Sequence, residues 1–202
     1  DAWIQARRVP VVLHPAAPRE RWRIAKDGTL TGPTAPPSAA VWASLGAEIV
    51  PSEGPYQLAP GCWTTGYVPR VTFEHSGRPA RTYYRDGDQL RPDDTDDDQA
   101  LIFSVQGKGL VILAGCAHAG IVNTVKHAQA ITGIDRVHAV IGGFHLGSAD
   151  ADELNQTIAA FKQWDADLIS PSHCTGFFPI NRFATEFPDT FVPGVVGVTY
   201  RL

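Results

Sequence analysis

Strand and helix patterns alternate along the second half of this chain, and that alternation restricts its fold more than any other feature. Two apolar runs, residues 100–105 and 110–114, flank Gln106-Gly107-Lys108-Gly109, which is a strong β-hairpin signal. Helices and strands are then predicted in turn, at residues 121–131, 137–141, 152–164, 168–170, 181–187 and 195–200. This order predicts a layered α/β architecture.

The first half of the chain holds shorter elements between segments rich in turn residues. Strands are predicted at residues 9–13, 48–50, 56–58 and 63–68, and helices at residues 19–25 and 39–45. Residues 27–38 are dense in Gly, Pro and Thr and predict a loop, whereas residues 74–98 predict a long polar surface excursion. Because nothing in this pattern indicates a domain boundary, we expect one domain over residues 1–202.

Charge and composition make several classes of partner unfavourable. A formal net charge of -4 provides no basic surface for nucleic acid or anionic lipid. No apolar stretch approaches the ~18 residues that a membrane helix needs, and residues 1–8 lack the order of a signal peptide. Three widely spaced cysteines argue for reduced thiols. We expect a cytoplasmic protein that acts on a small molecule, without nucleic acid or membrane partners; its oligomeric state cannot be predicted.

Three histidines share one position type, because each follows an apolar predicted strand. His118 follows residues 110–114, His145 follows residues 137–141, and His173 follows residues 168–170. The carboxyl ends of strands in α/β proteins collect ligand-binding and catalytic groups at one edge of the sheet. We therefore expect these three imidazoles to converge there.

Small residues around these histidines, among them Gly115, Gly120, Gly142 and Gly143, let the backbone approach a bound group closely. Neutral imidazole is a strong ligand for zinc, iron and related divalent metals, so converging imidazoles favour a metal site over simple packing. The four remaining histidines occupy a turn, a polar segment, a helix and a strand, and structural roles are favoured for them: His14, His75, His127 and His138.

Four linked motifs in the chain resemble one protein family. They are Asp97-Asp98-Gln99-Ala100-Leu101, residues 109–121 with Gly115-Cys116-Ala117-His118, Gly142-Gly143-Phe144-His145-Leu146, and His173-Cys174-Thr175-Gly176. In this order they resemble metallo-β-lactamase-fold proteins of the dihydropteridinyl-methyl-aminobenzene ribofuranosyl phosphate synthase-like branch. Residues 9–15, 45–50 and 65–70 also look like family segments, so the resemblance covers most of the chain.

The resemblance implies an αββα sandwich that holds metal at one edge of its paired sheets. His118 and His173 match positions that look like metal ligands in that family, and His145 matches a histidine that is either a ligand or a substrate contact. The implied cofactor is one or two divalent ions, zinc foremost, with iron or manganese as alternatives.

One family motif does not occur in this sequence. The His-x-His-x-Asp-His run that supplies much of the superfamily's metal site should lie just upstream of Asp1 by family order, and the chain contains no methionine. We therefore expect this chain to be a C-terminal portion of the fold, lacking its N-terminal part.

The activity that follows from the resemblance is hydrolysis of a small, anionic or phosphorylated substrate by a metal-bound hydroxide. Arg70, Asp98 and His145 are the candidate substrate contacts, and His145 and Cys116 the candidate catalytic residues. The helix predicted from residue 121 presents its N-terminus to the same edge, where it favours an anion such as phosphate. Cys116 could be a soft ligand, a thiol lining the site, or a buried filler residue.

Other functions fit parts of the same sequence. A Cys–His nucleophilic enzyme lacks an orienting third residue, and residues 93–98 lack the spacing of a calcium loop, so residues 93–96 predict a solvated turn. A catalytically inactive binding domain with an incomplete metal site is the principal alternative. Redox or lactone chemistry on the same scaffold stays open, because a fold does not determine function.

Overall fold

The computed structural model describes residues 8–74 and 82–202, and its residue contacts divide the chain into two compact units. The first unit comprises Asp1–Gly54 and Ser76–Asp97, and the second comprises Pro55–His75 and Asp98–Leu202. Each unit is described by itself below. The expectation of a single domain over residues 1–202 stays a prediction.

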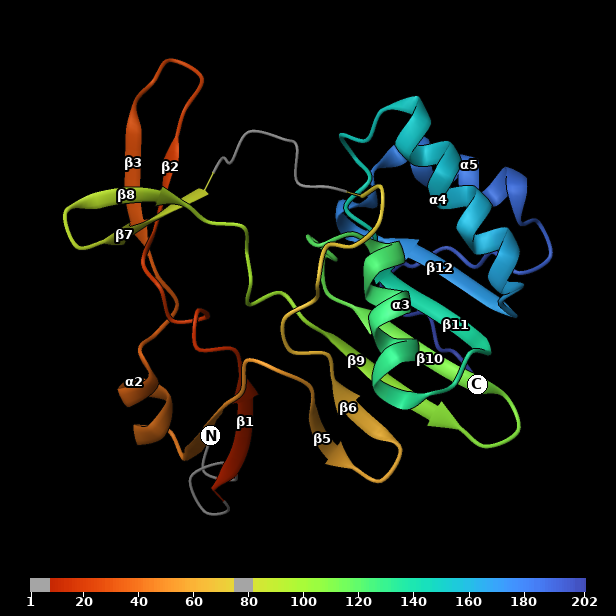
Figure 1. Ribbon diagram of the computed structural model, residues 1–202, viewed down its shortest axis with the longest axis horizontal. Helices are drawn as coiled ribbons and strands as arrows, with labels where there is room; N and C mark the ends of the chain where they lie inside the picture. Colours follow the sequence, from red (N-terminus) through yellow and green to blue (C-terminus); the bar gives the residue numbers. More distant parts are fainter. Residues whose placement is uncertain (1–7, 75–81) are drawn as a thin grey trace. The chain divides into compact units, whose positions relative to one another are not determined.

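A six-stranded mixed sheet forms the centre of the second unit, with the strand order β12-β11-β10-β9-β6-β5 (Figure 1). Its strands are β5 (Tyr56–Ala59), β6 (Cys62–Thr64), β9 (Ala100–Val105), β10 (Gly109–Ala114), β11 (Val137–Gly143) and β12 (Leu168–Ser172). The predicted hairpin is confirmed, since β9 and β10 pair antiparallel from Ala100 with Ala114 to Val105 with Gly109. Strands β10, β11 and β12 run parallel, so their carboxyl ends reach the same edge of the sheet.

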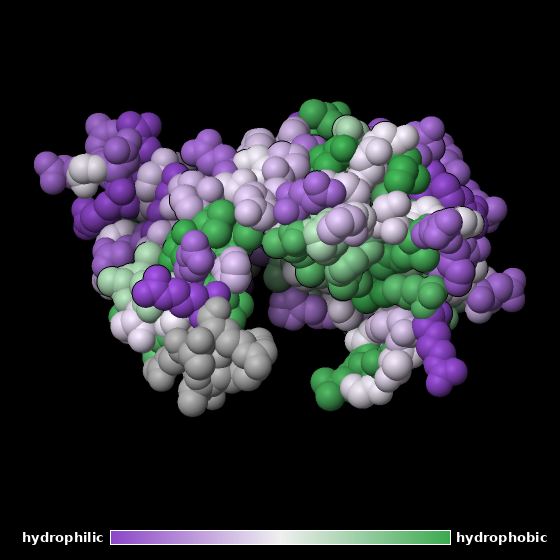
Figure 2. All heavy atoms as spheres, turned by 90° about the horizontal axis from the view of Figure 1, so that it is seen from below, coloured by the Kyte–Doolittle hydropathy of each residue, from purple (hydrophilic) through white to green (hydrophobic). Residues whose placement is uncertain are grey.

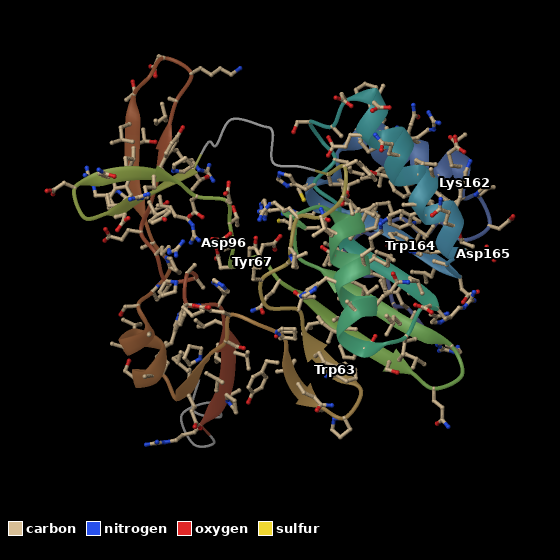
Figure 3. The ribbon with its side chains drawn as sticks, viewed as in Figure 1. Trp63, Tyr67, Asp96, Lys162, Trp164 and Asp165 are labelled. Atoms are coloured by element: carbon tan, nitrogen blue, oxygen red, sulfur yellow. The ribbon has the colours of Figure 1, made fainter. Side chains whose placement is uncertain are left out.

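Helices α3 (Ile121–Thr132) and α5 (Phe177–Glu186) pack against this sheet, and α4 (Ala151–Trp164) packs against both of these helices. Helix α4 begins as predicted, because the side chain of Asp150 accepts a hydrogen bond from the backbone N–H of Glu153 at 2.8 Å. Trp164 and Asp165 mark its end in Figure 3, where Asp165 takes the left-handed conformation at φ 49°. Helix α3 ends at Thr132, and its C-cap residue Gly133 is also in the left-handed region at φ 69°.

An aromatic cluster fills the core between the sheet and the helices. The rings of Phe144, Phe161 and Phe183 lie with their centroids 5.0 to 5.5 Å apart, and each residue is at most 1% exposed. Aromatic contacts at this separation contribute about 0.5–1.5 kcal/mol per pair beyond burial. Since Phe144 directly precedes His145, the core anchors the loop that carries this histidine.

The first unit contains two smaller sheets. Strands β1 (Val9–Leu13) and β4 (Ala47–Pro51) pair in parallel, and helix α2 (Ala39–Ser44) leads into β4. A four-stranded antiparallel sheet has the order β3-β2-β7-β8, with β2 (Arg21–Ile24), β3 (Leu30–Thr34), β7 (Thr82–Asp86) and β8 (Gln89–Pro92).

The helix predicted at residues 19–25 is wrong, because this segment forms β2. Trp22 is buried, whereas Arg23 and Ile24 are exposed, and β2 hydrogen-bonds to strands on both sides. Pairing with β3 and β7 therefore outweighs the helical pattern of this segment. The loop predicted at residues 27–38 is also wrong, because it contains β3, and the excursion predicted at residues 74–98 contains strands β7 and β8.

A buried carboxylate corrects the solvated turn predicted for residues 93–96. Asp93 is 6% exposed and accepts a hydrogen bond from Arg21 Nε at 2.6 Å, while Arg21 Nη2 donates to Asp97 at 2.5 Å. The positive charge of Arg21 compensates the burial of Asp93. Of the four residues in the predicted turn, 93–96, only Asp94 is exposed.

Other predicted elements agree more closely with the structure. Strand 9–13, helices 39–45, 121–131 and 152–164, and strands 137–141 and 168–170 are confirmed with shifts of a few residues. The helix predicted at residues 181–187 begins earlier, at Phe177, and the strand at residues 63–68 is shorter, ending at Thr64. The strand predicted at residues 195–200 is wrong: this segment makes turns, and Val196 is fully exposed.

Apolar side chains also occur on the surface, where green areas stand among the hydrophilic ones in Figure 2. In the second unit they include Phe177 and Phe178, which are 74% and 81% exposed at the start of α5. Among the described residues, the structure contains no helix with the length and apolarity needed to span a bilayer.

Candidate metal site

The three strand-end histidines lie in the segments that follow the parallel strands β10, β11 and β12, as the sequence predicts. Gly142 and Gly143 of β11 pair with Ala114 of β10 and Ser172 of β12 respectively, so the three loops start side by side. His173 opens the short 3-10 helix η1 (His173–Thr175). One edge of the sheet therefore presents all three segments.

Backbone strain is concentrated in these loops. Within residues 8–74 and 82–202, six non-glycine residues have a positive φ, and three of them are Ala117 at 53°, His145 at 50° and His173 at 50°. The left-handed region is unfavourable for residues with a Cβ, and such residues cluster at ligand and active sites. The strain therefore marks this edge as a candidate functional site.

His118 is held by Asp98 through two contacts. Asp98 Oδ2 accepts the backbone N–H of His118 at 2.6 Å and lies 3.0 Å from His118 Nδ1. Burial raises the pKa of Asp98, but its hydrogen bonds with the His118 side chain and backbone outweigh burial and hold that pKa below its ordinary value. Asp98 is therefore charged at neutral pH and orients the imidazole.

His145 lies against His118, with ring centroids 4.5 Å apart and ring planes at 52°. The loop carrying His145 is attached to η1 by Thr175, whose hydroxyl accepts the backbone N–H of Phe144 at 3.0 Å. The same hydroxyl donates to the carbonyl of Ser172 at 2.6 Å, and Thr175 is fully buried. Two of the three loops are thus joined by one side chain.

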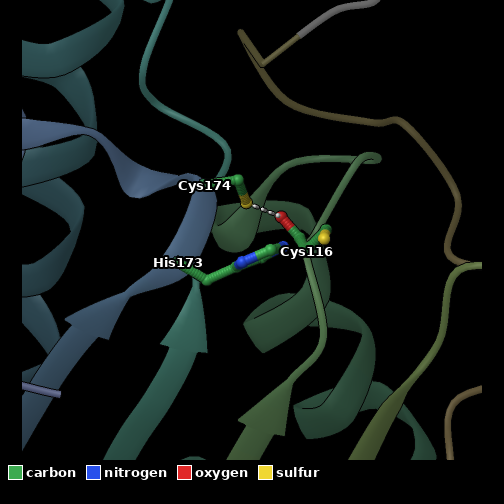
Figure 4. A group of neighbouring side chains, drawn as sticks. All are labelled: Cys116, His173 and Cys174. Carbon is green, nitrogen blue, oxygen red and sulfur yellow. Dashed lines mark hydrogen bonds between the residues drawn. The ribbon is translucent and has the colours of Figure 1, made fainter. Parts of the chain in front are cut away.

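His173 lies beside two cysteines, Cys116 and Cys174. In the part of the chain that the structure describes, one group of three metal-ligating side chains has all its ligand atoms within 4.8 Å of one another: Cys116, His173 and Cys174. Figure 4 shows the His173 ring extending toward Cys116, while Cys174 Sγ donates to the Cys116 carbonyl at 3.4 Å. His173 is exposed and both cysteines are half-buried.

The thiol of Cys116 is not activated as a nucleophile. Burial, together with the neighbouring Cys174 thiol, raises the pKa of Cys116 to about 12, so the thiol is protonated at neutral pH. A protonated thiol fits the roles of Cys116 as a site-lining or filler group and argues against a nucleophilic role in the metal-free chain. A bound cation would stabilise its thiolate.

Gly143 permits the two cysteine loops to approach each other. A Cβ on Gly143 would lie 2.8 Å from Cys174 Sγ, 3.1 Å from Cys116 Cα and 2.5 Å from the Gly115 carbonyl oxygen. Two of these neighbours are backbone atoms that cannot move easily. The predicted role of small residues at this edge is therefore supported by a specific steric reason at Gly143.

Glu74 is a residue of this region that the sequence analysis missed, because it fell within the predicted polar excursion. Its Oε2 accepts the backbone N–H of Asn123 at 2.9 Å, in the first turn of α3, and Glu74 is only 4% exposed. Burial is the largest effect and raises the pKa of Glu74 to about 7. A carboxyl group of the chain itself thus lies at the N-terminus of this helix, and the expectation that a phosphate binds there stays a prediction.

Arg70 lies in a segment, residues 68–72, that borders the site. Val68 lines a small cavity with Asp98 and Ala117, and the backbone N–H groups of Val71 and Thr72 both donate to Asn123 Oδ1 at 2.9 Å. Arg70 itself is half-buried. Its predicted contact with substrate stays a prediction, as does that of Asp98, whose observed partner is His118.

The other described histidines contact residues other than His118, His145 and His173. His14 Nδ1 accepts the backbone N–H of Ala16 at 3.1 Å, His127 Nε2 lies 3.2 Å from the carbonyl of Thr65, and His138 Nδ1 lies 2.6 Å from Asp167. These contacts agree with structural roles. His75 lies outside the described residues.

Comparison with known proteins identifies relatives for most of the chain, although no family model matches it. The chain is 34% identical over 189 residues to the 7,8-dihydropterin-6-methyl-4-(beta-D-ribofuranosyl)-aminobenzene-5'-phosphate synthase of Methanocaldococcus jannaschii, covering 92% of this chain and 63% of that protein. It is 33% identical over 151 residues to an uncharacterized protein of the same organism, covering 75% of this chain and 54% of that protein. The chain thus spans less than two thirds of the length of either relative.

A solved structure confirms the fold class. The crystal structure of a metal-dependent hydrolase of the beta-lactamase superfamily superposes with a TM-score of 0.76, covering 98% of this chain and 73% of that one, at 20% sequence identity. At this identity the likeness shows the fold alone. The sequence relative and the structural neighbour together bear out the resemblance on which the site prediction depends.

Proposed function

We propose that this chain belongs to a metal-dependent enzyme and that His118 and His173 supply imidazole ligands to a divalent cation. Two findings support this proposal: the fold of the metallo-β-lactamase superfamily, and the sequence similarity to the dihydropterin-ribofuranosyl-aminobenzene phosphate synthase. Zinc is the first candidate, with iron and manganese as alternatives. The single observation that carries this proposal is the placement of strained, histidine-bearing loops at the carboxyl ends of three parallel strands.

The contact between His118 and Asp98 supports a ligand role for His118. Histidines that bind metals generally donate their second ring N–H to a carboxylate, which fixes the tautomer and orients the ring. With Nδ1 directed to Asp98, the Nε2 atom of His118 is left as the ligand atom. The residues present therefore fit a cation.

The proposed reaction is hydrolysis of a small, anionic or phosphorylated molecule. A divalent cation in such a site lowers the pKa of a water molecule and so supplies a nucleophile at neutral pH. His145, beside His118, would contact the substrate or move a proton at its ring, and Arg70 would pair with a phosphate oxygen. The 5'-phosphate in the relative's name supports a phosphorylated substrate, and its designation as a synthase makes group transfer to an acceptor other than water the second candidate.

The test is turnover of p-nitrophenyl phosphate, bis(p-nitrophenyl) phosphate, a lactone and a thioester by the chain loaded with Zn²⁺ or Mn²⁺. Metal-dependent hydrolysis that is abolished in His173→Ala and retained in Cys62→Ser supports the proposal. Stoichiometric metal binding with no turnover of any of the four substrates contradicts the hydrolase and favours the inactive binding domain.

A further inference from the structure

Two thiols stand beside His173, and the hydrolase proposal makes no use of them as a pair. We propose that Cys116, His173 and Cys174 form a sulfur-containing site that binds a thiophilic divalent cation such as Zn²⁺ or Co²⁺. This inference rests on the proposed function through His173, which both share, and it adds two cysteine ligands to the site.

The distances within the group suit one ion. The ligand atoms of the three residues all lie within 4.8 Å of one another. Zinc–thiolate bonds of about 2.3 Å in a tetrahedron place two sulfur atoms roughly 3.8 Å apart. Side-chain rotations that shorten the widest separation by about 1 Å therefore bring the three atoms onto one cation.

The surrounding backbone holds the group in place. Gly143 has no Cβ where one would collide with Cys174 Sγ and the backbone at Cys116, so the loops after β10 and β12 approach closely. Cys174 Sγ is directed at the Cys116 carbonyl, as Figure 4 shows, and Thr175 fastens η1 to the loop of Phe144. The cysteines are thus placed by rigid neighbours, whereas the exposed His173 can turn toward an ion.

The donor set selects the kind of ion. Two sulfurs and one imidazole favour zinc and cobalt over magnesium, calcium and manganese, which prefer oxygen ligands. Cys116, His173 and Cys174 supply three of the four ligands of a tetrahedral zinc ion, which leaves the fourth position for His118 or for water. Binding converts both thiols to thiolates, so two protons pass to the solvent for each ion bound.

The experiment is an anaerobic titration of the reduced full chain with Co²⁺, followed by absorption spectroscopy. Cobalt–thiolate bonds produce charge-transfer absorption in the near ultraviolet that imidazole and carboxylate ligands do not produce. We expect this absorption in the unaltered chain, with saturation at one equivalent. Cys116→Ser and Cys174→Ser should each weaken Co²⁺ binding at least tenfold and reduce the absorption per ion by about half.

Cys62→Ser is the matched control, because Cys62 lies on β6, outside the group. It should leave the titration unchanged, and equal loss of absorption in this variant would overturn the inference. Co²⁺ binding with visible ligand-field bands but no charge-transfer absorption would also overturn it, while the proposed imidazole site would stand. No Co²⁺ binding at all would overturn both.

Discussion

Asp98 binds His118 through a single oxygen, Oδ2, which accepts the backbone N–H at 2.6 Å and lies 3.0 Å from Nδ1. Both partners lie at strand boundaries: Asp98 comes two residues before β9, and His118 four residues after β10. The antiparallel pairing of these strands places Ala100 beside Ala114 and so brings the two ends together. The hairpin register therefore determines which carboxylate orients the histidine.

Asp98→Asn should weaken Zn²⁺ or Co²⁺ binding by about 10- to 100-fold, because the imidazole loses the anionic partner that orients it. Isothermal titration calorimetry measures the change, and thermal unfolding of the metal-free chain checks the fold. Asp135→Asn is a control, since Asp135 is exposed. Unchanged affinity in Asp98→Asn would show that His118 does not depend on this carboxylate.

Gly143→Ala should disrupt the edge that carries the cysteines. The added methyl group meets backbone atoms of Gly115 and Cys116, and such overpacking costs about 1–3 kcal/mol in unfolding free energy. Urea denaturation measures this cost, and Co²⁺ titration should show weaker binding. Gly54→Ala, where nothing lies within 4 Å of the new Cβ, should change stability by less than about 0.5 kcal/mol. Equal effects of the two substitutions would refute the steric argument.

Thr175→Val removes the hydroxyl that joins the loops of Phe144 and Ser172 while keeping the side-chain shape. The buried N–H of Phe144 loses its acceptor, which costs about 1–3 kcal/mol. Chemical denaturation should detect this loss. In Thr185→Val, whose hydroxyl lies on the exposed side of α5, the change should stay within about 0.5 kcal/mol. A Thr175→Val chain as stable as the parent would rule out the proposed link.

Glu74 should make the stability of the chain depend on pH. Its pKa is about 7 when folded against an ordinary value of 4.5, so the folded state retains a proton that the unfolded state releases within this window. Stability from this group is therefore full below pH 4.5 and falls as pH rises to 7, by roughly 3 kcal/mol for a shift of this size. Glu74→Gln should remove that fall.

Urea denaturation at pH 5 and pH 8 tests this expectation. The parent chain should lose more stability than Glu74→Gln between the two values, whereas exposed Glu53→Gln should follow the parent. Identical pH profiles of stability for Glu74→Gln and the parent would show that protonation of Glu74 does not cause the pH dependence.

The second half of the fold is predictable from the sequence because its signals are local. The hairpin turn at residues 106–109, the cap at Asp150 and the apolar strands before each histidine are all visible in short windows, and the structure confirms those elements. The convergence of three loops then follows from parallel strand order alone.

The first half is less predictable because pairing between distant segments decides it. Residues 21–24 form a strand only because β3 and β7 flank them, and Asp93 is buried only because Arg21, 72 residues away, pairs with it. The burial of Glu74 is not predictable for the same reason, since its partner Asn123 lies 49 residues further along the chain. Such contacts leave no local periodicity in the sequence.

The most direct test of the central claim is equilibrium dialysis of the purified chain against Zn²⁺. We predict stoichiometric binding of one or two ions, reduced at least tenfold in affinity by either His118→Ala or His173→Ala and unaffected by His127→Gln, since His127 lies on α3 and contacts Thr65. Failure to bind Zn²⁺, or binding that survives both alanine substitutions, would contradict the assignment of a cation to this edge of the sheet.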